Sequence, residues 1–217
     1  MTRLHIFDMD GTLLHGAASV ELSRHLGAGI FAAADAVERS WVRGEISDTG
    51  FWEAVLPLWV GVTESQIDGA FTAAPWIDGL RGVFADISAR GEVCAVISQS
   101  PLFFVRRLEQ WGAHRTFGTR VAPGVAVTDD QLLTVRDKVD ITLGLLEEFG
   151  LDEGACVAYG DSSSDVLLFD HLRHTVGVNC KEVLRERSAA VYDGADLREA
   201  YALGRSLLDG TPAGCPR

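Results

Sequence analysis

The chain has 217 residues, of which 47% are hydrophobic and 23% are charged, as in an ordinary globular protein. This length allows one well-buried core with a smaller second unit. Against 19 Lys and Arg stand 31 Asp and Glu, a formal net charge of −12, and so acidic a surface excludes nucleic acid and anionic membranes as expected partners.

The first third of the chain changes from a short strand to a run of helices. The apolar residues 4–7 predict a buried strand that ends in a tight loop at residues 8–11. Apolar positions then recur at helical spacing, and the segments Gly27-Ala28-Gly29 and Gly61 lie between predicted helices. The four predicted helices are 19–26, 30–42, 49–59 and 64–73. This block is too long for one crossover between strands, so we interpret it as an inserted helical cap.

The rest of the chain alternates helices and strands. The predicted helices are 80–90, 102–111, 138–149, 166–172 and 182–186. The predicted strands or extended segments are 92–97, 117–127, 155–159, 175–178 and 190–192, and a frayed tail follows at 210–217. This alternation indicates a doubly wound, mostly parallel α/β sheet covered on both faces. The predicted organisation is a core of residues 1–14 and 76–217 with a cap of residues 15–75.

Two carboxylates, Asp8 and Asp10, follow the first predicted strand. Residues two apart on an extended chain point to the same side, and open α/β sheets bind ligands beyond the carboxyl ends of their strands. Two acids in one crevice repel each other unless a cation or divided roles separate them: one stays ionised, and the other shuttles a proton. Gly11 would let the backbone approach a ligand, although a plain polar turn is the alternative.

Ser98 and Lys138 are two further candidates. Ser98 follows an apolar run, and we expect Ser100 to cap the next helix with Pro101 in its first turn, which leaves the Ser98 hydroxyl free for a phosphate oxygen. Lys138, near a helix start, could neutralise a phosphate and hold a nucleophilic carboxylate. Taken singly, a turn serine and a surface lysine are the simpler interpretations.

Asp161 and Asp165 follow a strand and Gly160. Acids four apart at a helix start lie on one face, and oxygen ligands there suit Mg²⁺, which uses few carboxylates. A capping aspartate is the alternative for either residue alone. The order and strand-end placement of all these residues together favour one crevice that binds a phosphate and a metal.

With these motifs the chain resembles the haloacid dehalogenase superfamily, and within it the phosphoserine phosphatase-like branch with a helical C1-type cap. The resemblance covers nearly the whole chain, through Asp8-Met9-Asp10-Gly11-Thr12-Leu13, Ser98, Lys138 and Gly160-Asp161-Ser162-Ser163-Ser164-Asp165. It implies Asp8 as the nucleophile that becomes an aspartyl-phosphate, and Asp10 as the acid that protonates the leaving alcohol and later activates water.

The resemblance also implies the ligands of a cofactor and of the phosphoryl group. Mg²⁺ would be held by Asp8, the backbone carbonyl of Met9 and Asp161, with Asp165 in support. The phosphoryl group would be held by Ser98, Lys138, Gly11 and Thr12. The segment 117–132 is similar to the short extended flap that precedes the lysine in this family.

The function predicted from the resemblance is hydrolysis of a small phosphorylated metabolite by a Mg²⁺-dependent phosphomonoesterase. Asp10 argues against a dehalogenase, because a departing halide needs no proton. A phosphotransferase or phosphomutase, and a non-catalytic binding module of the same fold, are the alternatives. The absence of CxxC pairs and of apolar spans favours a soluble protein of the cytoplasm, and the oligomeric state stays open.

Substrate selection should depend on the cap. In phosphoserine phosphatases a glutamate and a cap arginine recognise serine, but the matching positions here are Ala17 and the neighbourhood of Glu53. This departure supports the hypothesis of a substrate, such as an amino-alcohol phosphate, that bears an amine but no carboxylate. Glu53 and His15 are the candidate specificity residues, although His15 could simply lie in a hinge. We expect most of the aromatic residues at 41, 51, 52, 59 and 76 to pack within the cap.

Overall fold

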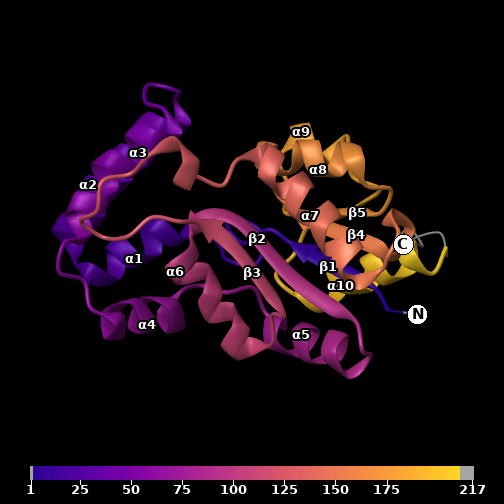
Figure 1. Ribbon diagram of the computed structural model, residues 1–217. Helices are drawn as coiled ribbons and strands as arrows, with labels where there is room; N and C mark the ends of the chain where they lie inside the picture. The colour runs from indigo at the N-terminus through magenta and orange to yellow at the C-terminus, as the bar shows by residue number, and fades with distance from the viewer. Residues whose placement is uncertain (1, 211–217) are drawn as a thin grey trace.

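A six-stranded parallel sheet forms the centre of the computed structural model, which describes residues 2–210 (Figure 1). Its order is β3-β2-β1-β4-β5-β6. The strands are β1 (Leu4–Phe7), β2 (Val93–Pro101), β3 (Arg115–Thr119), β4 (Cys156–Gly160), β5 (Thr175–Val178) and β6 (Ala190–Tyr192). Every neighbouring pair is parallel, and the predicted doubly wound α/β sheet is confirmed.

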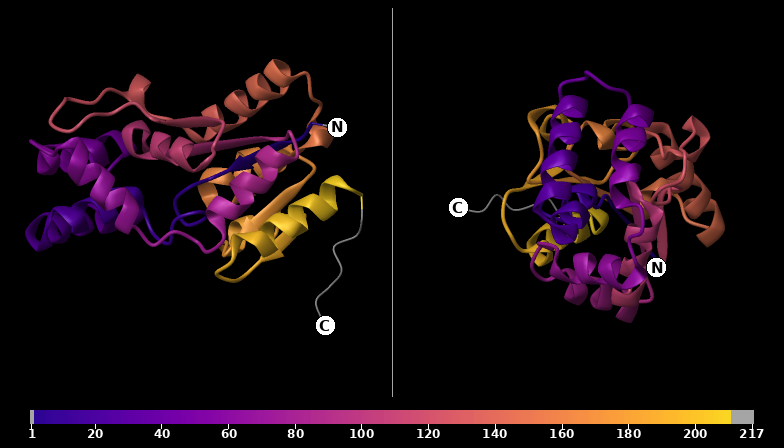
Figure 2. Two further views of the ribbon diagram at one scale, coloured as in Figure 1. Left: turned by 90° about the horizontal axis from the view of Figure 1, so that it is seen from below. Right: turned by 90° about the vertical axis from the view of Figure 1, so that its left-hand side faces the viewer.

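Helices cover both faces of the sheet (Figure 2). Because side chains alternate along a strand, Phe7 packs on one face with residues of α5 (Leu80–Ala89) and α10 (Leu197–Leu208). Leu4 and Ile6 pack on the other face with residues of α7 (Val135–Phe149), α8 (Val166–His171) and α9 (Glu182–Arg185). The two apolar layers hold β1 rigidly in the middle of the sheet.

Helix α10 is absent from the sequence-based prediction. Asp196 caps its first turn by accepting the N–H of Arg198, at 3.0 Å. Its buried residues recur at helical spacing: Leu197, Ala200, Tyr201 and Gly204. Both signals are local, so this helix was predictable.

A run of helices lies between β1 and α5 in the chain: α1 (Ala18–Leu26), α2 (Ala28–Val42), α3 (Asp48–Val55), η1 (Leu56–Trp59) and α4 (Glu64–Ala73). The three-residue break predicted at 27–29 is wrong, because Gly27 alone, with φ of 126°, separates α1 from α2. The predicted helix 49–59 becomes α3 and the 3₁₀ turn η1, which contains Pro57 near its start.

Several boundaries of the remaining elements also differ from the prediction. Strand β2 continues to Pro101 rather than ending at residue 97, and the predicted helix 102–111 consists of α6 (Leu102–Val105) and η2 (Arg106–Trp111). Strand β3 ends at Thr119, so the segment predicted to be extended up to 127 is a loop beyond that point, followed by η3 (Asp129–Gln131). Helix α7 begins at Val135, three residues before the predicted start. Two short turns complete the order, η4 (Glu153–Ala155) and η5 (Ser163–Asp165). The predicted frayed tail lies almost entirely outside the described residues.

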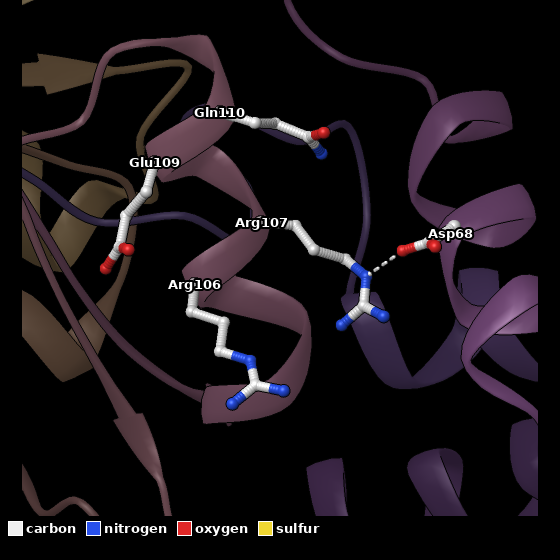
Figure 3. Close-up of a pocket in the computed structure, with 5 residues that line it drawn as sticks. All are labelled: Asp68, Arg106, Arg107, Glu109 and Gln110. Carbon is white, nitrogen blue, oxygen red and sulfur yellow. Dashed lines mark hydrogen bonds and ion pairs between the residues drawn. The ribbon is translucent and has the colours of Figure 1, made fainter.

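Helix α4 packs against the core through aromatic rings and forms ion pairs with Arg107. Phe71 of α4 packs on Phe104 and Trp111, with ring centroids 5.5 and 4.5 Å apart. The Arg107 side chain is only 8% exposed and pairs with Glu64 at 2.6 Å and Asp68 at 2.7 Å. Figure 3 shows the pairing with Asp68 at one side of a cleft of about 380 Å³. Arg107 thus contributes to the contact between η2 and α4 and is not part of a solvated helix face.

The aromatic residues of the inserted helices mostly pack, as expected. Phe51, Trp52 and Trp59 are buried, whereas Trp41 is 37% exposed. No helix in the described part of the chain combines the length and apolarity needed to cross a membrane.

Candidate active site

The strand order brings the predicted site residues to one edge of the sheet. Strand β1 lies between β2 and β4, with Phe7 opposite both Val96 and Tyr159. Asp8 follows Phe7, and its N–H donates to the Tyr159 carbonyl at 2.9 Å. The side chains that follow these three strands therefore lie together at the same edge of the sheet.

Lys138 connects two buried carboxylates. Its Nζ lies 2.7 Å from Oδ1 of Asp8 and 2.7 Å from Oδ1 of Asp165, and it donates to the Ser164 hydroxyl at 3.3 Å. Burial opposes the charged amine, but Asp165 and Asp8 outweigh it and raise the Lys138 pKa above its usual value. Burial also raises the pKa of Asp8, and Lys138 opposes that rise. The ammonium thus favours an ionised Asp8 and hydrogen-bonds one of its two carboxylate oxygens.

Asp165 organises the turn that carries Asp161. While its Oδ1 binds Lys138, its Oδ2 accepts the N–H groups of Asp161 at 3.2 Å and Ser162 at 3.4 Å. A Cβ on Gly160 would come within 2.5 Å of the Asp165 carboxyl carbon. The glycine before Asp161 is therefore needed for Asp165 to fold back under the turn.

Asp161 faces the loop after β1. Its Oδ1 is buried and has no hydrogen-bond partner among residues 2–210. Burial, with the nearby Asp165 carboxylate, raises the pKa of Asp161 to about 6. Gly11 has φ of +82°, and a Cβ there would lie 2.2 Å from Oδ2 of Asp161. Gly11 thus makes room for a carboxylate.

The acidic residues fit a hard divalent cation. Asp8, Asp161 and Asp165 each offer a carboxylate oxygen, and these oxygens all lie within 4.8 Å of one another. Together with Asp10 they make four carboxyl groups, against which Lys138 supplies one positive charge. The orphaned Oδ1 of Asp161 and the all-oxygen donor set are what Mg²⁺ would satisfy.

Asp10 stands apart from Lys138 and has its own partners. Its Oδ1 accepts the N–H of Ala18 at 3.0 Å, and its Oδ2 accepts the hydroxyl of Ser100 at 2.5 Å. Burial raises the Asp10 pKa to about 6, although the bonds from Ser100 and Ala18 lower it. A carboxyl that titrates there can both give and take a proton near neutral pH.

Ser100 is a site residue that the sequence analysis missed. We predicted it as a helix cap, but α6 has Pro101 at its N-cap position with no side-chain cap bond. Since β2 continues to Pro101, Ser100 lies two residues beyond Ser98 on the same side of the strand. That spacing was the available signal.

Ser98 is buried at the end of the sheet, as predicted for a phosphate ligand. It is 1% exposed, and its Oγ accepts the N–H of Ser100 at 3.1 Å. Its own hydroxyl proton is not used by that bond and is available to a phosphate oxygen.

The backbone groups predicted from the first motif are engaged within their own turn. The Met9 carbonyl, a predicted metal ligand, accepts the N–H groups of Leu13 and Leu14, both at 2.9 Å. The Gly11 N–H donates to the Leu14 carbonyl at 2.8 Å, and the Thr12 N–H to Met9 at 3.3 Å. These groups close the turn in this structure, and the metal-binding role of the Met9 carbonyl and the phosphate-binding roles of Gly11 and Thr12 stay predictions. The Thr12 hydroxyl donates to Oδ2 of Asp8 at 3.4 Å.

The two predicted specificity residues, Glu53 and His15, are both exposed. Glu53 is exposed and lines a cleft of about 340 Å³ with Pro57 and the loop residues 124–127. The His15 side chain is exposed. Its backbone N–H donates to the Pro75 carbonyl at 2.9 Å, where the chain returns from α4 toward the sheet. This position matches the alternative of a hinge histidine. No hydrogen bond or ion pair within the described residues joins either side chain to Asp8 or Asp10.

Comparison with known proteins agrees with this arrangement of a parallel α/β core and a carboxylate crevice. The family model for haloacid dehalogenase-like hydrolases matches residues 6–170. A phosphoserine phosphatase of Archaeoglobus fulgidus is 25% identical over 205 residues, which are 91% of this chain and 57% of that protein. The chain thus spans a little over half the length of that relative. A phosphoserine phosphatase of Methanocaldococcus jannaschii is 22% identical, with 91% of this chain and 95% of that protein covered.

The solved structures show the same fold. A substrate-bound phosphoserine phosphatase complex superposes with a TM-score of 0.75 at 21% sequence identity, over 93% of this chain and 98% of that one. The fold and site thus define a hydrolase with a parallel α/β core and an aspartate-rich crevice. The chain belongs to the haloacid dehalogenase-like hydrolase family. The resemblance to this superfamily and its phosphatase-type enzymes is confirmed at the level of the family.

Proposed function

We propose that this chain is a Mg²⁺-dependent phosphomonoesterase that hydrolyses a small phosphorylated metabolite through an aspartyl-phosphate on Asp8. The observation that carries the proposal is the contact of the Lys138 ammonium with both Asp8 and Asp165, 2.7 Å from each, beside an Asp10 carboxyl held separately by Ser100. The likeness to phosphoserine phosphatases supports the reaction class.

The reaction proceeds in two displacements. A carboxylate oxygen of Asp8 attacks phosphorus, the bond to the ester oxygen breaks, and Asp10 gives its proton to the departing alcohol. A water then loses its proton to Asp10 and attacks phosphorus, which releases phosphate and restores Asp8. The Lys138 ammonium and the Ser98 hydroxyl would hold the phosphoryl oxygens.

Asp8, Asp161 and Asp165 would hold Mg²⁺, since their oxygens converge. The bound ion would neutralise charge on the phosphoryl oxygens. The backbone carbonyl of Met9 stays in the proposed ligand set, and it also accepts hydrogen bonds within its own turn.

The remaining expectations belong to the same proposal. We propose residues 15–75 as a cap over a core of residues 1–14 and 76–217, and a small phosphate ester as the partner. The cysteines at 94, 156 and 180 are buried and free, in keeping with a cytoplasmic enzyme. A substrate bearing an amine remains the hypothesis for specificity.

Phosphate release from a panel of phosphate monoesters tests this function. The panel would include phosphoserine, phosphoethanolamine, histidinol phosphate and glycerol phosphate, each with Mg²⁺ and with chelator. We expect metal-dependent release that Asp8→Asn abolishes. Release only when an acceptor alcohol is added would establish a phosphotransferase. No release from folded protein across the panel would contradict the proposal.

A further inference from the structure

The first two inserted helices form a hairpin that returns to Asp10. The N–H of Ala18, the first residue of α1, donates to Oδ1 of Asp10 at 3.0 Å. Helix α1 has 9 residues, only Gly27 separates it from α2, and the two helices pack together (Figure 1). Since both helices rise about 1.5 Å per residue, α2 comes back to the level of Ala18 roughly ten residues after Gly27. Glu38 lies at that level.

The Glu38 carboxylate is unpaired in the part of the chain that the structure describes. It is half-buried and makes no ion pair or hydrogen bond within residues 2–210. Burial raises its pKa, the Asp10 and Asp35 carboxylates add to the rise, and Lys181 opposes it. Glu38 is therefore within electrostatic reach of Asp10 in the core and of Lys181. The N–H of Lys181 donates to the Asp161 carbonyl at 2.8 Å, so Lys181 adjoins a residue of the candidate site.

Glu38 differs from the other acid on this part of α2. Asp35, one turn earlier, is paired with Arg39. A half-buried carboxylate without such a partner, near other carboxylates, is unfavourable in the free protein. A positive charge brought by a ligand would remove that penalty.

The proposed reaction fixes which part of the substrate meets Glu38. The phosphoryl group binds at Lys138 and Ser98, and the ester oxygen must lie against Asp10, which protonates it. The carbon atoms beyond that oxygen then extend toward the helices above Asp10. Resting on the proposed function, we infer that Glu38 determines specificity by binding an ammonium or other cationic group on the leaving alcohol. The substrate class is a cationic phosphate monoester, and Glu38 replaces Glu53 as the recognising acid.

Steady-state kinetics on two esters tests the inference. Phosphoethanolamine carries the cation, and glycerol phosphate is a neutral-alcohol ester of similar size. In the wild type we expect the higher kcat/KM for phosphoethanolamine. Glu38→Gln should lower that value about tenfold or more, mainly by raising KM, because the negative charge that pairs with the ammonium is lost. The value for glycerol phosphate should stay within about twofold. Asp35→Asn is the matched control and should alter neither ester.

The outcomes separate this inference from the proposed function. No phosphate release from any ester by the wild type would sink both. Equal losses on the two esters in Glu38→Gln would overturn the inference alone, since they would show that Glu38 supports Asp10 or the fold. Lys181→Met provides a second check. If Lys181→Met and Glu38→Gln change kcat/KM by the same factor on each of the two esters, the two residues pair with each other and not with substrate.

Discussion

The hydrogen bond from Ser100 determines where Asp10 titrates. Burial raises the Asp10 pKa to about 6, and the Ser100 bond lowers it by stabilising the ionised carboxylate. Ser100→Ala should therefore raise the pKa further, by about one unit. Because Asp10 must be protonated to release the alcohol, the alkaline limb of the kcat/KM profile should move to higher pH. Profiles of the variant and the wild type measure the shift.

Ser206→Ala is the control for this shift. Ser206 lies in α10 and donates to the Ala202 carbonyl, remote from β2. Its substitution should leave the limb in place. An unmoved limb in Ser100→Ala would mean that Asp10 is not the group whose proton leaves with the alcohol.

Gly11 is required for two separable reasons. Its φ of +82° disfavours any side chain, and a Cβ would lie 2.2 Å from Oδ2 of Asp161. Gly44, with φ of +72° and nothing within 4 Å of an added Cβ, has only the first problem. Each substitution by alanine should cost about 1 kcal/mol of stability through the backbone. Gly11→Ala alone should weaken Mg²⁺ binding, by about tenfold or more, because Asp161 is displaced.

Calorimetric titration with Mg²⁺ compares these two variants. Gly44→Ala should bind like the wild type. If Gly11→Ala also binds normally, Asp161 is not a ligand whose position depends on this glycine.

The site could be predicted from the sequence only where side-chain type decides the chemistry. Asp8, Lys138 and Asp161 follow strands or begin a helix, and parallel topology brings such positions together. Ser100 could not be placed, because the continuation of β2 depends on pairing Pro101 with Thr119 of β3. Residue type also does not show whether the Met9 carbonyl is free for a metal, because turn hydrogen bonds decide that.

At the scale of elements, Gly204 allows α10 to lie against β4. A Cβ there would come within 2.1 Å of the Tyr159 hydroxyl. Tyr159 is 1% exposed and stacks on Phe7 with ring centroids 4.3 Å apart, so it has little room to move. Gly204→Ala should destabilise the protein by about 1–3 kcal/mol.

Gly144 of α7 is the control, because a Cβ added there would have no atom within 4 Å. Gly144→Ala should stabilise the protein by about 0.5–1 kcal/mol. Urea unfolding of both variants distinguishes overpacking from helix propensity, and a stabilised Gly204→Ala would refute the close contact.

Arg107 joins η2 to α4 through partners that are largely exposed. The side chains of Glu64 and Asp68 are 71% and 63% exposed, so solvent screens these ion pairs and each contributes modestly. Arg107→Met should cost about 1 kcal/mol and lower the Tm by about 2–4 °C. The exposed neighbour provides the control, Arg106→Met, which should leave the Tm unchanged. Equal Tm values for the two variants would show that the aromatic contacts of Phe71 alone fasten α4.

The elements that could be predicted are those with a strong local pattern. The apolar strands β1 and β5 have the predicted bounds of 4–7 and 175–178. The loop after β3 could not be predicted, since its course depends on distant contacts. The N–H of Gly124 donates to the Leu56 carbonyl at 3.1 Å, which ties this loop to η1. Residue type gives no sign of that pairing.

For the whole molecule, the unbalanced negative charge links stability to the cation. The chain carries a formal −12, and the buried carboxylates concentrate part of it in one crevice. Burial raises the Asp161 pKa to about 6, above its unfolded value. Without metal, the folded state therefore loses stability as pH rises from about 4 to about 6, on the order of 3 kcal/mol in all. At pH 8, metal-free Asp161→Asn should be at least as stable as the metal-free wild type.

Mg²⁺ should reverse that order. Because the ion binds the folded state only, a concentration 100 times its Kd should stabilise the wild type by about 2.7 kcal/mol. Asp161→Asn should gain little, because a ligand is lost. Thermal unfolding at pH 8 measures the stabilisation by Mg²⁺, and NaCl at matched ionic strength measures the part that is due to charge screening. Asp140 is an exposed acid of α7, and Asp140→Asn is the control variant, which should be stabilised by Mg²⁺ as the wild type is. If NaCl stabilises the wild type as much as Mg²⁺ does, the effect is general charge screening and the carboxylates do not form a specific site.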